Sequence, residues 1–306
     1  MAEAQSGILA EGEAFGVFLT ALLAEGDEAA AQVRRIAAEL PALTRSMAAR
    51  LGDSSLVSVI AFGAAAWPRL FAAAKPEGLV PFESLADGPR RAPATPADLF
   101  IHIHSSRHDV NFALAREVMK RLGAAARLVE EVHGFRYLEG RDLTGFVDGT
   151  ENAKGGERAG VALVGGEDTV FAGGSYVSLQ RYVHDLGRWE ALALAEQEGA
   201  IGRTREDDQE LDDAVKPPSA HIARVVIEEE GAELEILRHS LPYGTTVEHG
   251  LYFVAYCRSP APFRKMLERM VRRDGDGHAD RLLDFTTPVT GAAFFAPATA
   301  FLEGLV

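Results

Sequence analysis

A strand-like segment followed by a helix-like segment occurs twice in this chain, about half its length apart. Residues 98–106 alternate like a strand, and residues 110–122 have helical periodicity. Residues 250–259 and 263–271 repeat this order. Other strands are predicted at 14–22, 55–62, 130–138, 175–182, 220–227 and 234–239, and other helices at 28–40 and 186–196. Each half therefore has the order β-α-β-β-α-β, which is the ferredoxin-like arrangement.

Two such halves predict an α+β protein built from duplicated ferredoxin-like halves, of the dimeric α+β barrel type, with antiparallel sheets and peripheral helices. We expect an N-terminal half at residues 1–141, a connecting loop at 142–174 and a C-terminal half at 175–306. The connecting loop contains three glycine pairs. A connection of roughly 30 residues with little secondary structure is uncommon unless it is functional or disordered. We therefore expect functional residues within it.

The composition limits the classes of function. With 47% hydrophobic and 25% charged residues, the chain resembles an ordinary globular protein that buries a sizeable core. Its formal net charge of -14 disfavours binding to nucleic acid and to anionic membranes. One cysteine, Cys257, excludes an internal disulfide and a cysteine-rich metal site. We find no secretory signal and no apolar segment of membrane-spanning length, so we expect a cytoplasmic protein.

The connecting loop contains one carboxylate that stands between glycines. The sequence around Asp148 is Gly-Phe-Val-Asp-Gly-Thr, from Gly145 to Thr150. A tight, glycine-rich turn is a common way to direct a side chain into a pocket, although an isolated Asp-Gly is usually only a turn. The residues that follow about 70 to 90 positions later favour a functional role for Asp148.

Three segments of the second half carry further candidates. A proline-stiffened loop brings His221 to the entry of the strand predicted at 220–227. Arg238 and Ser240 are two residues apart near the end of another predicted segment, so in an extended chain they point the same way. Asp284 lies among apolar neighbours, where an unpaired carboxylate would be costly. Each of these residues alone is more simply explained as structural.

Together these residues make chemical sense around a haem. A neutral imidazole can bind iron, and a carboxylate on its other nitrogen orients it and gives it anionic character. On the opposite face, splitting a peroxide needs a proton moved between its two oxygens, which a carboxylate can do. It also needs a fixed cation where negative charge develops, which arginine supplies.

The same residues resemble the dye-decolorizing peroxidase family, and most closely its compact class-B branch. The block from Gly145 to Thr150 is similar to the family's Gly-x-x-Asp-Gly signature, and the match continues over almost the whole chain. The resemblance implies a haem-dependent peroxidase that reduces hydrogen peroxide and oxidises dyes, phenolic or other aromatic donors through a ferryl intermediate. It implies haem b (iron protoporphyrin IX) in the C-terminal half, with His221 as axial ligand of the iron and Asp284 behind it. The implied peroxide-side catalytic residues are Asp148, Arg238 and Ser240.

The resemblance also implies a second set of cofactor-binding residues. Arg203 matches a family position near the haem propionates, and Thr150 and Asn152 are expected to shape the loop at the haem edge. We further expect Arg238 to lower the pKa of Asp148. Which of Asp148 and Arg238 carries more of the proton transfer stays open here.

Three other functions are alternatives to a peroxidase. A haem-handling protein that binds or stores haem, or releases its iron, is the main alternative, with peroxidase activity incidental. The related folds that process chlorite or coproporphyrin do not fit the Gly-x-x-Asp-Gly block. A non-haem metal on His102 and His104 comes last, because a half-exposed strand face explains this pair. The family implies a homo-oligomer, and the short segment after Phe295 is no Gly/Pro-rich extension, so docking in an encapsulin compartment is disfavoured.

Overall fold

The N-terminal half follows the predicted order of strands and helices. The computed structural model describes residues 3–12 and 14–305. The elements of this half are β1 (Phe15–Leu23), α1 (Asp27–Leu51), β2 (Val57–Gly63), α2 (Trp67–Leu70), β3 (Leu85–Asp87), β4 (Arg90–Ala92), β5 (Leu99–Ser105), α3 (His108–Leu122), the 3-10 turn η1 (Gly123–Ala125) and β6 (Ala126–Phe135). Helix α1 continues beyond the predicted end, through Pro41. The buried positions Thr44 and Met47 lie after the proline, so burial of this face outweighs the lost hydrogen bond.

The elements after β6 are shorter and more interrupted. They are η2 (Leu138–Gly140), α4 (Glu157–Ala162), β7 (Ser175–His184), α5 (Leu186–Glu190), α6 (Leu194–Ile201), α7 (His221–Val225), β8 (Glu228–Glu229), β9 (Ala232–Glu233), β10 (Leu237–Arg238), β11 (Leu241–Gly244), β12 (His249–Cys257), α8 (Ala261–Val271), η3 (Arg281–Asp284), β13 (Thr286–Pro288), β14 (Ala292–Ala296) and α9 (Thr299–Glu303). The strand predicted at 220–227 is wrong, because this segment begins with helix α7. The strand predicted at 234–239 is limited to the two residues of β10.

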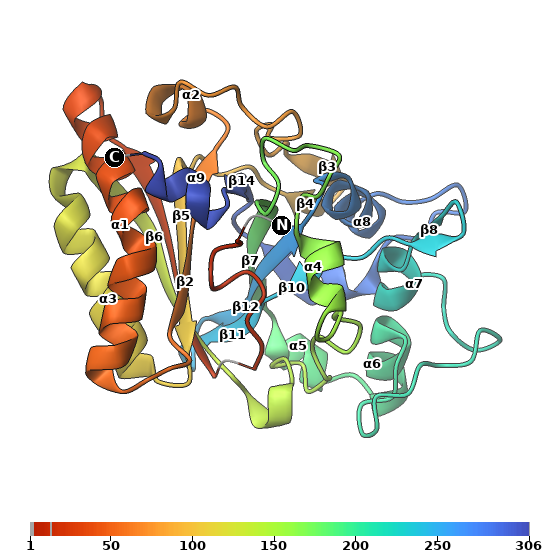
Figure 1. Cartoon of the computed structure of the whole chain (residues 1–306). Coiled ribbons are helices and arrows are strands. Elements are labelled where there is room, and N and C mark those ends of the chain that lie inside the picture. The colour runs from red at the N-terminus through yellow and green to blue at the C-terminus, as the bar shows by residue number, and fades with distance from the viewer. Residues whose placement is uncertain (1–2, 13, 306) are drawn as a thin grey trace.

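Eight antiparallel strands close into a barrel that both halves share (Figure 1). The order of neighbours is β12-β11-β6-β1-β5-β2-β14-β7, and β7 pairs with β12 to close the ring. Within each half the order is that of a ferredoxin-like sheet, and the halves join where β6 meets β11 and β2 meets β14. The predicted fold class, with duplicated halves and peripheral helices, is therefore confirmed.

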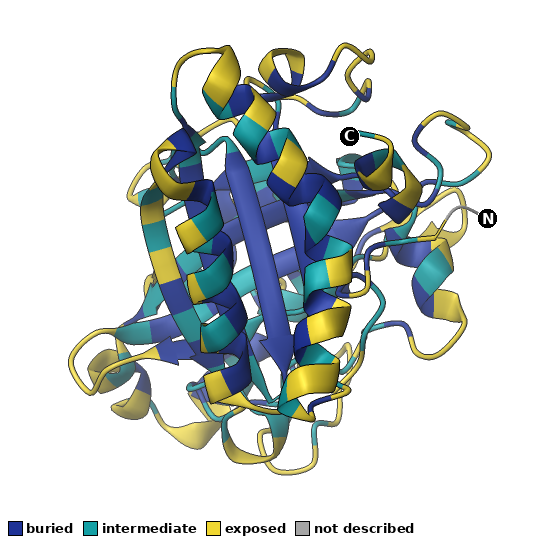
Figure 2. Ribbon diagram, turned by 60° about the vertical axis from the view of Figure 1, so that its left-hand side comes forward, coloured by how far each residue is buried: buried dark blue, intermediate teal, exposed yellow. Residues whose placement is uncertain are grey.

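The helices cover the outside of the barrel, and the barrel interior is filled. Helices α1 and α3 lie side by side over the N-terminal strands, with buried faces turned to the sheet (Figure 2). Inside the barrel, the rings of Phe18, His102 and His104 stack on one another. His102 and His104 are 1% and 2% exposed, so the expected half-exposed strand face is wrong. Burial and the neighbouring His104 and His239 hold the pKa of His102 well below its usual value.

The described residues contain neither a membrane-spanning helix nor a cluster of metal-binding side chains. Among residues 3–12 and 14–305, no helix has the length and apolar character needed to cross a membrane. In the same residues, no three His, Cys, Asp or Glu side chains are grouped so that they could hold a metal ion. His102 instead hydrogen-bonds through Nδ1 to the Tyr256 hydroxyl at 3.0 Å, and His104 Nε2 hydrogen-bonds to the Gly7 carbonyl at 3.1 Å.

Candidate active site

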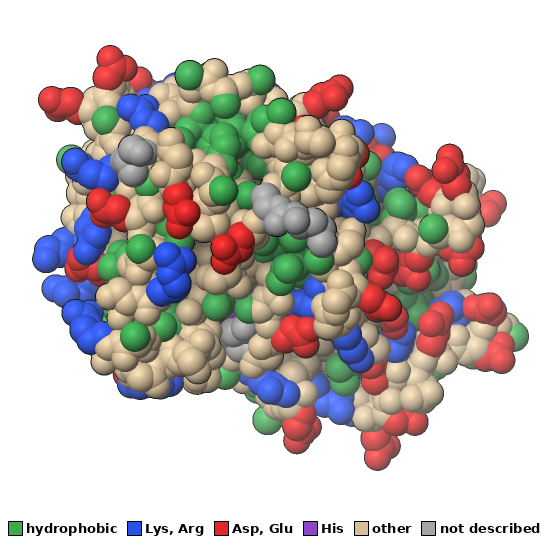
Figure 3. Space-filling view, in the orientation of Figure 1, with side chains coloured by type: hydrophobic (Ala, Val, Ile, Leu, Met, Phe, Trp, Pro, Cys, Tyr) green, Lys and Arg blue, Asp and Glu red, His purple; other side chains and the backbone are tan. Residues whose placement is uncertain are grey.

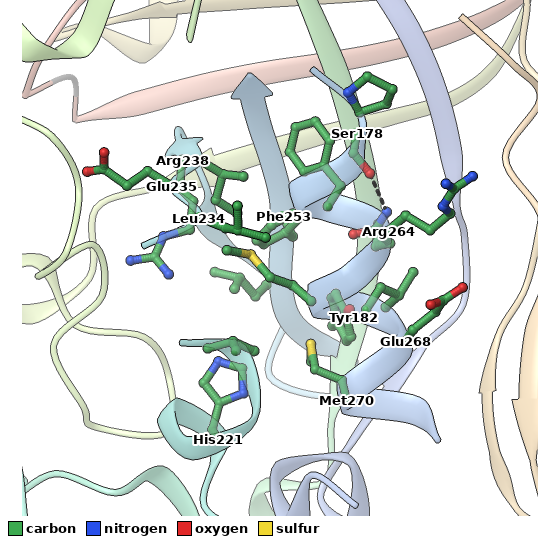
Figure 4. A pocket seen from close by; sticks show the side chains of 18 of the residues that line it. Ser178, Tyr182, His221, Leu234, Glu235, Arg238, Phe253, Arg264, Glu268 and Met270 are labelled. Carbon is green, nitrogen blue, oxygen red and sulfur yellow. Dashed lines mark hydrogen bonds between the residues drawn. The ribbon is translucent and has the colours of Figure 1, made fainter. Parts of the chain in front are cut away.

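A cavity of about 320 Å³ lies against the outer face of the C-terminal strands. Strands β7, β10 and β12 form one wall, and helices α7 and α8 face them (Figure 4). Its walls are mainly apolar, with Leu234, Phe253 and Met270 among them. The titratable side chains that meet in it include Asp142, Asp148, His184, Arg203, His221 and Arg238. A mainly apolar pocket with a few convergent polar groups is the usual form of a cofactor or substrate site.

His221 stands at the start of α7 and lies on the α7 side of the cavity (Figure 4). Its Nδ1 donates a 2.6 Å hydrogen bond to Asp280 Oδ2, and the Asp280 side chain has no solvent exposure. The other oxygen of Asp280 accepts a hydrogen bond from the Leu282 backbone N–H at 2.9 Å. The carboxylate is therefore fully partnered, and the imidazole ring has one fixed orientation.

Asp284, the residue predicted to support His221, does not contact it, so this prediction is wrong. Its Oδ1 accepts a 2.6 Å hydrogen bond from Arg90, and its side chain is 43% exposed. Asp280 is the residue that sequence reasoning missed. Its available signal is that of a helix N-cap, an aspartate directly before the turn η3 that starts at Arg281.

Helix α7 forms where a strand was predicted because tertiary contacts outweigh the β-branched residues Val225 and Val226. Arg224 is buried, and its guanidinium donates to the Arg269 carbonyl at 3.0 Å and to Asp274 Oδ2 at 2.7 Å. These bonds tie α7 to the C-terminal end of α8. The helix in turn directs His221 into the cavity.

Asp148 reaches the cavity from the connecting loop. Its backbone N–H donates to the Gly140 carbonyl at 3.1 Å, and Gly149 follows with a φ of 79°. Burial raises the pKa of Asp148, while the nearby Arg238 charge lowers it and Asp142 raises it. The net direction is upward, so the expectation that Arg238 would lower the pKa of Asp148 is wrong. The cost of removing the carboxylate from water outweighs the attraction of the guanidinium.

A second acidic residue, Asp142, lies beside Asp148 in the cavity wall and forms a pair with His184. His184 Nε2 donates to Asp142 Oδ1 at 3.1 Å, and His184 Nδ1 hydrogen-bonds to Thr286 Oγ1 at 2.7 Å. Sequence reasoning missed both members of this pair. The His184 and Asp142 side chains are 5% and 14% exposed.

Arg238 lies at the end of β10, and its side chain enters the cavity from the wall opposite α7 (Figure 4). Its Nε is buried and has no hydrogen-bond partner within residues 3–12 and 14–305. Ser240 is absent from the side chains that line the cavity, and its Oγ accepts a hydrogen bond from the Val254 N–H at 3.3 Å. The alternation expected for Arg238 and Ser240 fails because β10 ends at Arg238 and β11 begins only at Leu241.

The remaining predicted residues lie at one edge of the cavity. Arg203 is 13% exposed and pairs with Glu151, with Asp208 Oδ1 at 3.6 Å and with Glu210 Oε2 at 3.9 Å. Thr150 also lines the cavity and donates to Asp208 Oδ2 at 2.5 Å. Acidic side chains gather on this side of the molecule, over α6, α7 and β8 (Figure 3).

Asn152, the last predicted residue, lies behind the cavity wall rather than in it. It is absent from the lining side chains, and its amide contacts the backbone of Arg238. The structure therefore brings Asp148, Thr150, Arg203, His221 and Arg238 to one cavity. It does not bring Ser240, Asn152 or Asp284 there.

Family models and a curated relative match this chain, and all of them are Dyp-type peroxidases. Residues 5–136 match the model of the Dyp-type peroxidase N-terminal domain, and residues 139–301 match that of the C-terminal domain. The chain is 44% identical over 291 residues to a dye-decolorizing peroxidase of Mycobacterium tuberculosis, covering 94% of this chain and 86% of that protein.

Solved structures show the same likeness. The encapsulated DyP-type peroxidase from Mycobacterium smegmatis has a TM-score of 0.95 and 42% identity, over 99% of this chain and 98% of that one. A variant of DypB from Rhodococcus jostii RHA1 in complex with heme has a TM-score of 0.94 and 39% identity, over 99% of both chains.

Proposed function

Because this chain belongs to the Dyp-type peroxidase family and is a haem peroxidase, we propose a role in that reaction for each residue of the cavity. Haem is the cofactor, as in the complex of the Rhodococcus relative. The alternative of a haem-handling protein is not favoured, since the relatives are named as peroxidases.

The residues of the cavity fit a haem. His221 offers its Nε2 toward the cavity because Nδ1 is committed to Asp280. An imidazole held in this way is the usual protein ligand of haem iron in peroxidases. On the other wall, the Nε of Arg238 is a buried donor with no partner in the described part of the chain, and a ligand in the cavity can satisfy it. We propose His221 as the axial ligand, with Asp280 fixing its ring.

The opposite wall holds the groups that handle peroxide. When bound, the haem iron supplies the electrons that cleave the O–O bond and later recovers them from a donor. Asp148 accepts the proton from one peroxide oxygen and returns it to the other, because it is the carboxylate that meets Arg238 in the cavity. Arg238 is permanently charged and stabilises the negative charge that develops on the leaving oxygen.

Arg203 lies at one edge of the cavity, where the haem carboxylates are expected. A haem carries two carboxylates, and Arg203 is the cation at that edge of the cavity. We propose that Arg203 binds one of them, and that Thr150 holds Asp208 in place beside it. Dyes, phenols and other aromatic molecules are the proposed electron donors. A homo-oligomeric state, a cytoplasmic location and the lack of docking in an encapsulin compartment stay predictions.

The observation that carries these roles is that His221, fixed by Asp280, shares one cavity with Asp148 and Arg238, and that Arg238 enters it from the wall opposite α7. Three single variants test it. His221→Ala is expected to lose the Soret band of the purified protein. Asp148→Ala and Arg238→Ala are expected to keep that band, yet to slow the spectral change caused by peroxide about a hundredfold in stopped flow. An Asp148→Ala variant that reacts at the parent rate would leave the chemistry to Arg238 and overturn the role of Asp148.

A further inference from the structure

The side chain of Asn152 is bound to the backbone of Arg238 by two hydrogen bonds. Asn152 Nδ2 donates to the Arg238 carbonyl at 2.9 Å, and the Arg238 N–H donates to Asn152 Oδ1 at 3.0 Å. We propose that Asn152 is a positioning residue that holds Arg238 in register with Asp148 for the reaction with peroxide. This inference rests on the peroxide-side roles proposed above and names the device that brings the two residues together.

Strand β10 explains why Arg238 needs this partner. It contains only two residues, and it pairs with β12 through Leu237↔Tyr256 and Arg238↔Ala255. In an antiparallel pair the backbone groups of successive residues point to alternate edges. The N–H and carbonyl of Arg238 point to the edge where no strand follows in the sheet order, and Asn152 takes the place of that strand. Without Asn152 both groups lose their protein partner.

The same residue is connected to Asp148 through a tight turn. The Asn152 N–H donates to the Gly149 carbonyl at 3.0 Å, so residues 149–152 form a turn that directly follows Asp148. Gly149 has a φ of 79°, and a Cβ there would lie 3.3 Å from Asn152 Nδ2. A glycine at this position therefore allows both the turn and the close approach of the Asn152 amide. The loop carrying Asp148 and the strand carrying Arg238 meet through Asn152.

The position of the Arg238 guanidinium depends strongly on where strand β10 places the Arg238 backbone. Its Nε has no hydrogen-bond partner within the described residues, so no hydrogen bond at this nitrogen fixes the side chain. A shift of β10 would therefore move the guanidinium relative to Asp148. Small displacements of catalytic groups slow reactions considerably. Asn152 is outside the lining of the cavity and bonds to the backbone of Arg238, so it acts through Arg238.

The test is a double-mutant cycle in the haem-loaded protein. Asn152→Ala is made both in the parent protein and in the Arg238→Ala variant. Arg238→Ala keeps the backbone N–H and carbonyl that Asn152 binds. We expect Asn152→Ala to slow the peroxide-induced Soret change about tenfold in the parent and less than twofold in the Arg238→Ala background. The loss of thermal stability from Asn152→Ala is expected to be equal in both backgrounds, because the two backbone bonds are present in both.

Hydrogen exchange gives a readout that does not depend on activity. The amide of Arg238 is expected to exchange faster in Asn152→Ala, in either background, while the amides of β12 paired with β7 are unchanged. Lys154→Ala, an exposed position on the same loop, is the control and is expected to leave the rate and the exchange at parent values.

Two results would overturn the inference. One is a parent-like rate in Asn152→Ala, and the other is an equal slowing by Asn152→Ala with and without Arg238. Failure of the proposed function looks different, because Arg238→Ala alone would then react at the parent rate.

Discussion

His221 Nδ1 and Asp280 Oδ2 are joined by a 2.6 Å hydrogen bond, and the Asp280 side chain is entirely enclosed by protein. A buried carboxylate in this position gives the imidazole anionic character and strengthens it as a ligand. Anionic ligation stabilises the higher oxidation state of iron. Asp280 therefore bears on the redox properties of the protein although it does not line the cavity.

Replacement of Asp280 is expected to raise the reduction potential of the haem. Asp280→Asn keeps an oxygen for the Leu282 N–H but removes the negative charge that faces His221. We expect a rise of about 59 mV or more, a tenfold change for a one-electron couple, in spectroelectrochemical titration. Asp284→Asn is the matched control, because Asp284 pairs with Arg90 and not with His221. The reduction potential of the haem in this variant is expected to stay at the parent value. An unchanged potential in Asp280→Asn would contradict the coupling.

The architecture was predictable because its signals are local. The strand and helix patterns at 98–122 and 250–271 repeat within one chain, and alternation and helical periodicity arise from neighbouring residues. The same is true of Asp148, since a glycine-flanked carboxylate in a long loop is visible without a structure. The boundaries 1–141, 142–174 and 175–306 stay a prediction.

The errors in the site arise from contacts between distant segments. Asp280 and Asp284 are four residues apart, and only the packing of α7 decides which of them meets His221. Ser240 was expected beside Arg238 because a continuous strand was assumed, whereas the strand is interrupted after Arg238. The pKa of Asp148 was misjudged because the charge of Arg238 is readable in sequence and the depth of the cavity is not.

The pH dependence of the peroxide reaction is expected to move in opposite directions in two variants. The reaction needs ionised Asp148, so its rate falls as the pH drops through the pKa of that residue. Burial raises this pKa, and the acid limb therefore lies above the usual range of an aspartate. Arg238→Ala removes the attraction that favours the carboxylate and shifts the limb upward. Asp142→Asn removes a repulsion and shifts it downward by a smaller amount.

Stopped-flow rates across the acid range, normalised to the plateau of each variant, measure these shifts. Asp142→Asn keeps an oxygen for His184 Nε2 but loses the oxygen that accepts from the Thr144 N–H and Oγ1, so the Soret band of this variant is first compared with that of the parent. A limb that moves in the same direction in both variants would show that a group other than Asp148 controls the profile.

Gly149 is expected to tolerate no side chain. Its φ of 79° is unfavourable for alanine, and the new Cβ would approach Asn152 Nδ2 to 3.3 Å. We expect Gly149→Ala to lower the free energy of unfolding by about 1–2 kcal/mol and to slow the peroxide reaction through Asn152. Gly156→Ala is the control, because Gly156 has a φ of -66° and open space around it. Urea denaturation that finds equal stabilities for the two variants would show that the turn is not strained.

The retention of haem is expected to depend on competition for Arg203. Its guanidinium already pairs with Glu151, whose side chain is 54% exposed, and any haem carboxylate must share it. Arg203→Ala is therefore expected to speed haem loss about tenfold, the equivalent of 1.4 kcal/mol. Glu151→Gln removes a competing anion and is expected to slow the loss about twofold, since an exposed ion pair contributes little. Transfer of haem to excess haem-free myoglobin, followed at the Soret band, gives both rates. If both variants lose haem at the parent rate, Arg203 only forms ion pairs with Glu151, Asp208 and Glu210 and does not hold the cofactor.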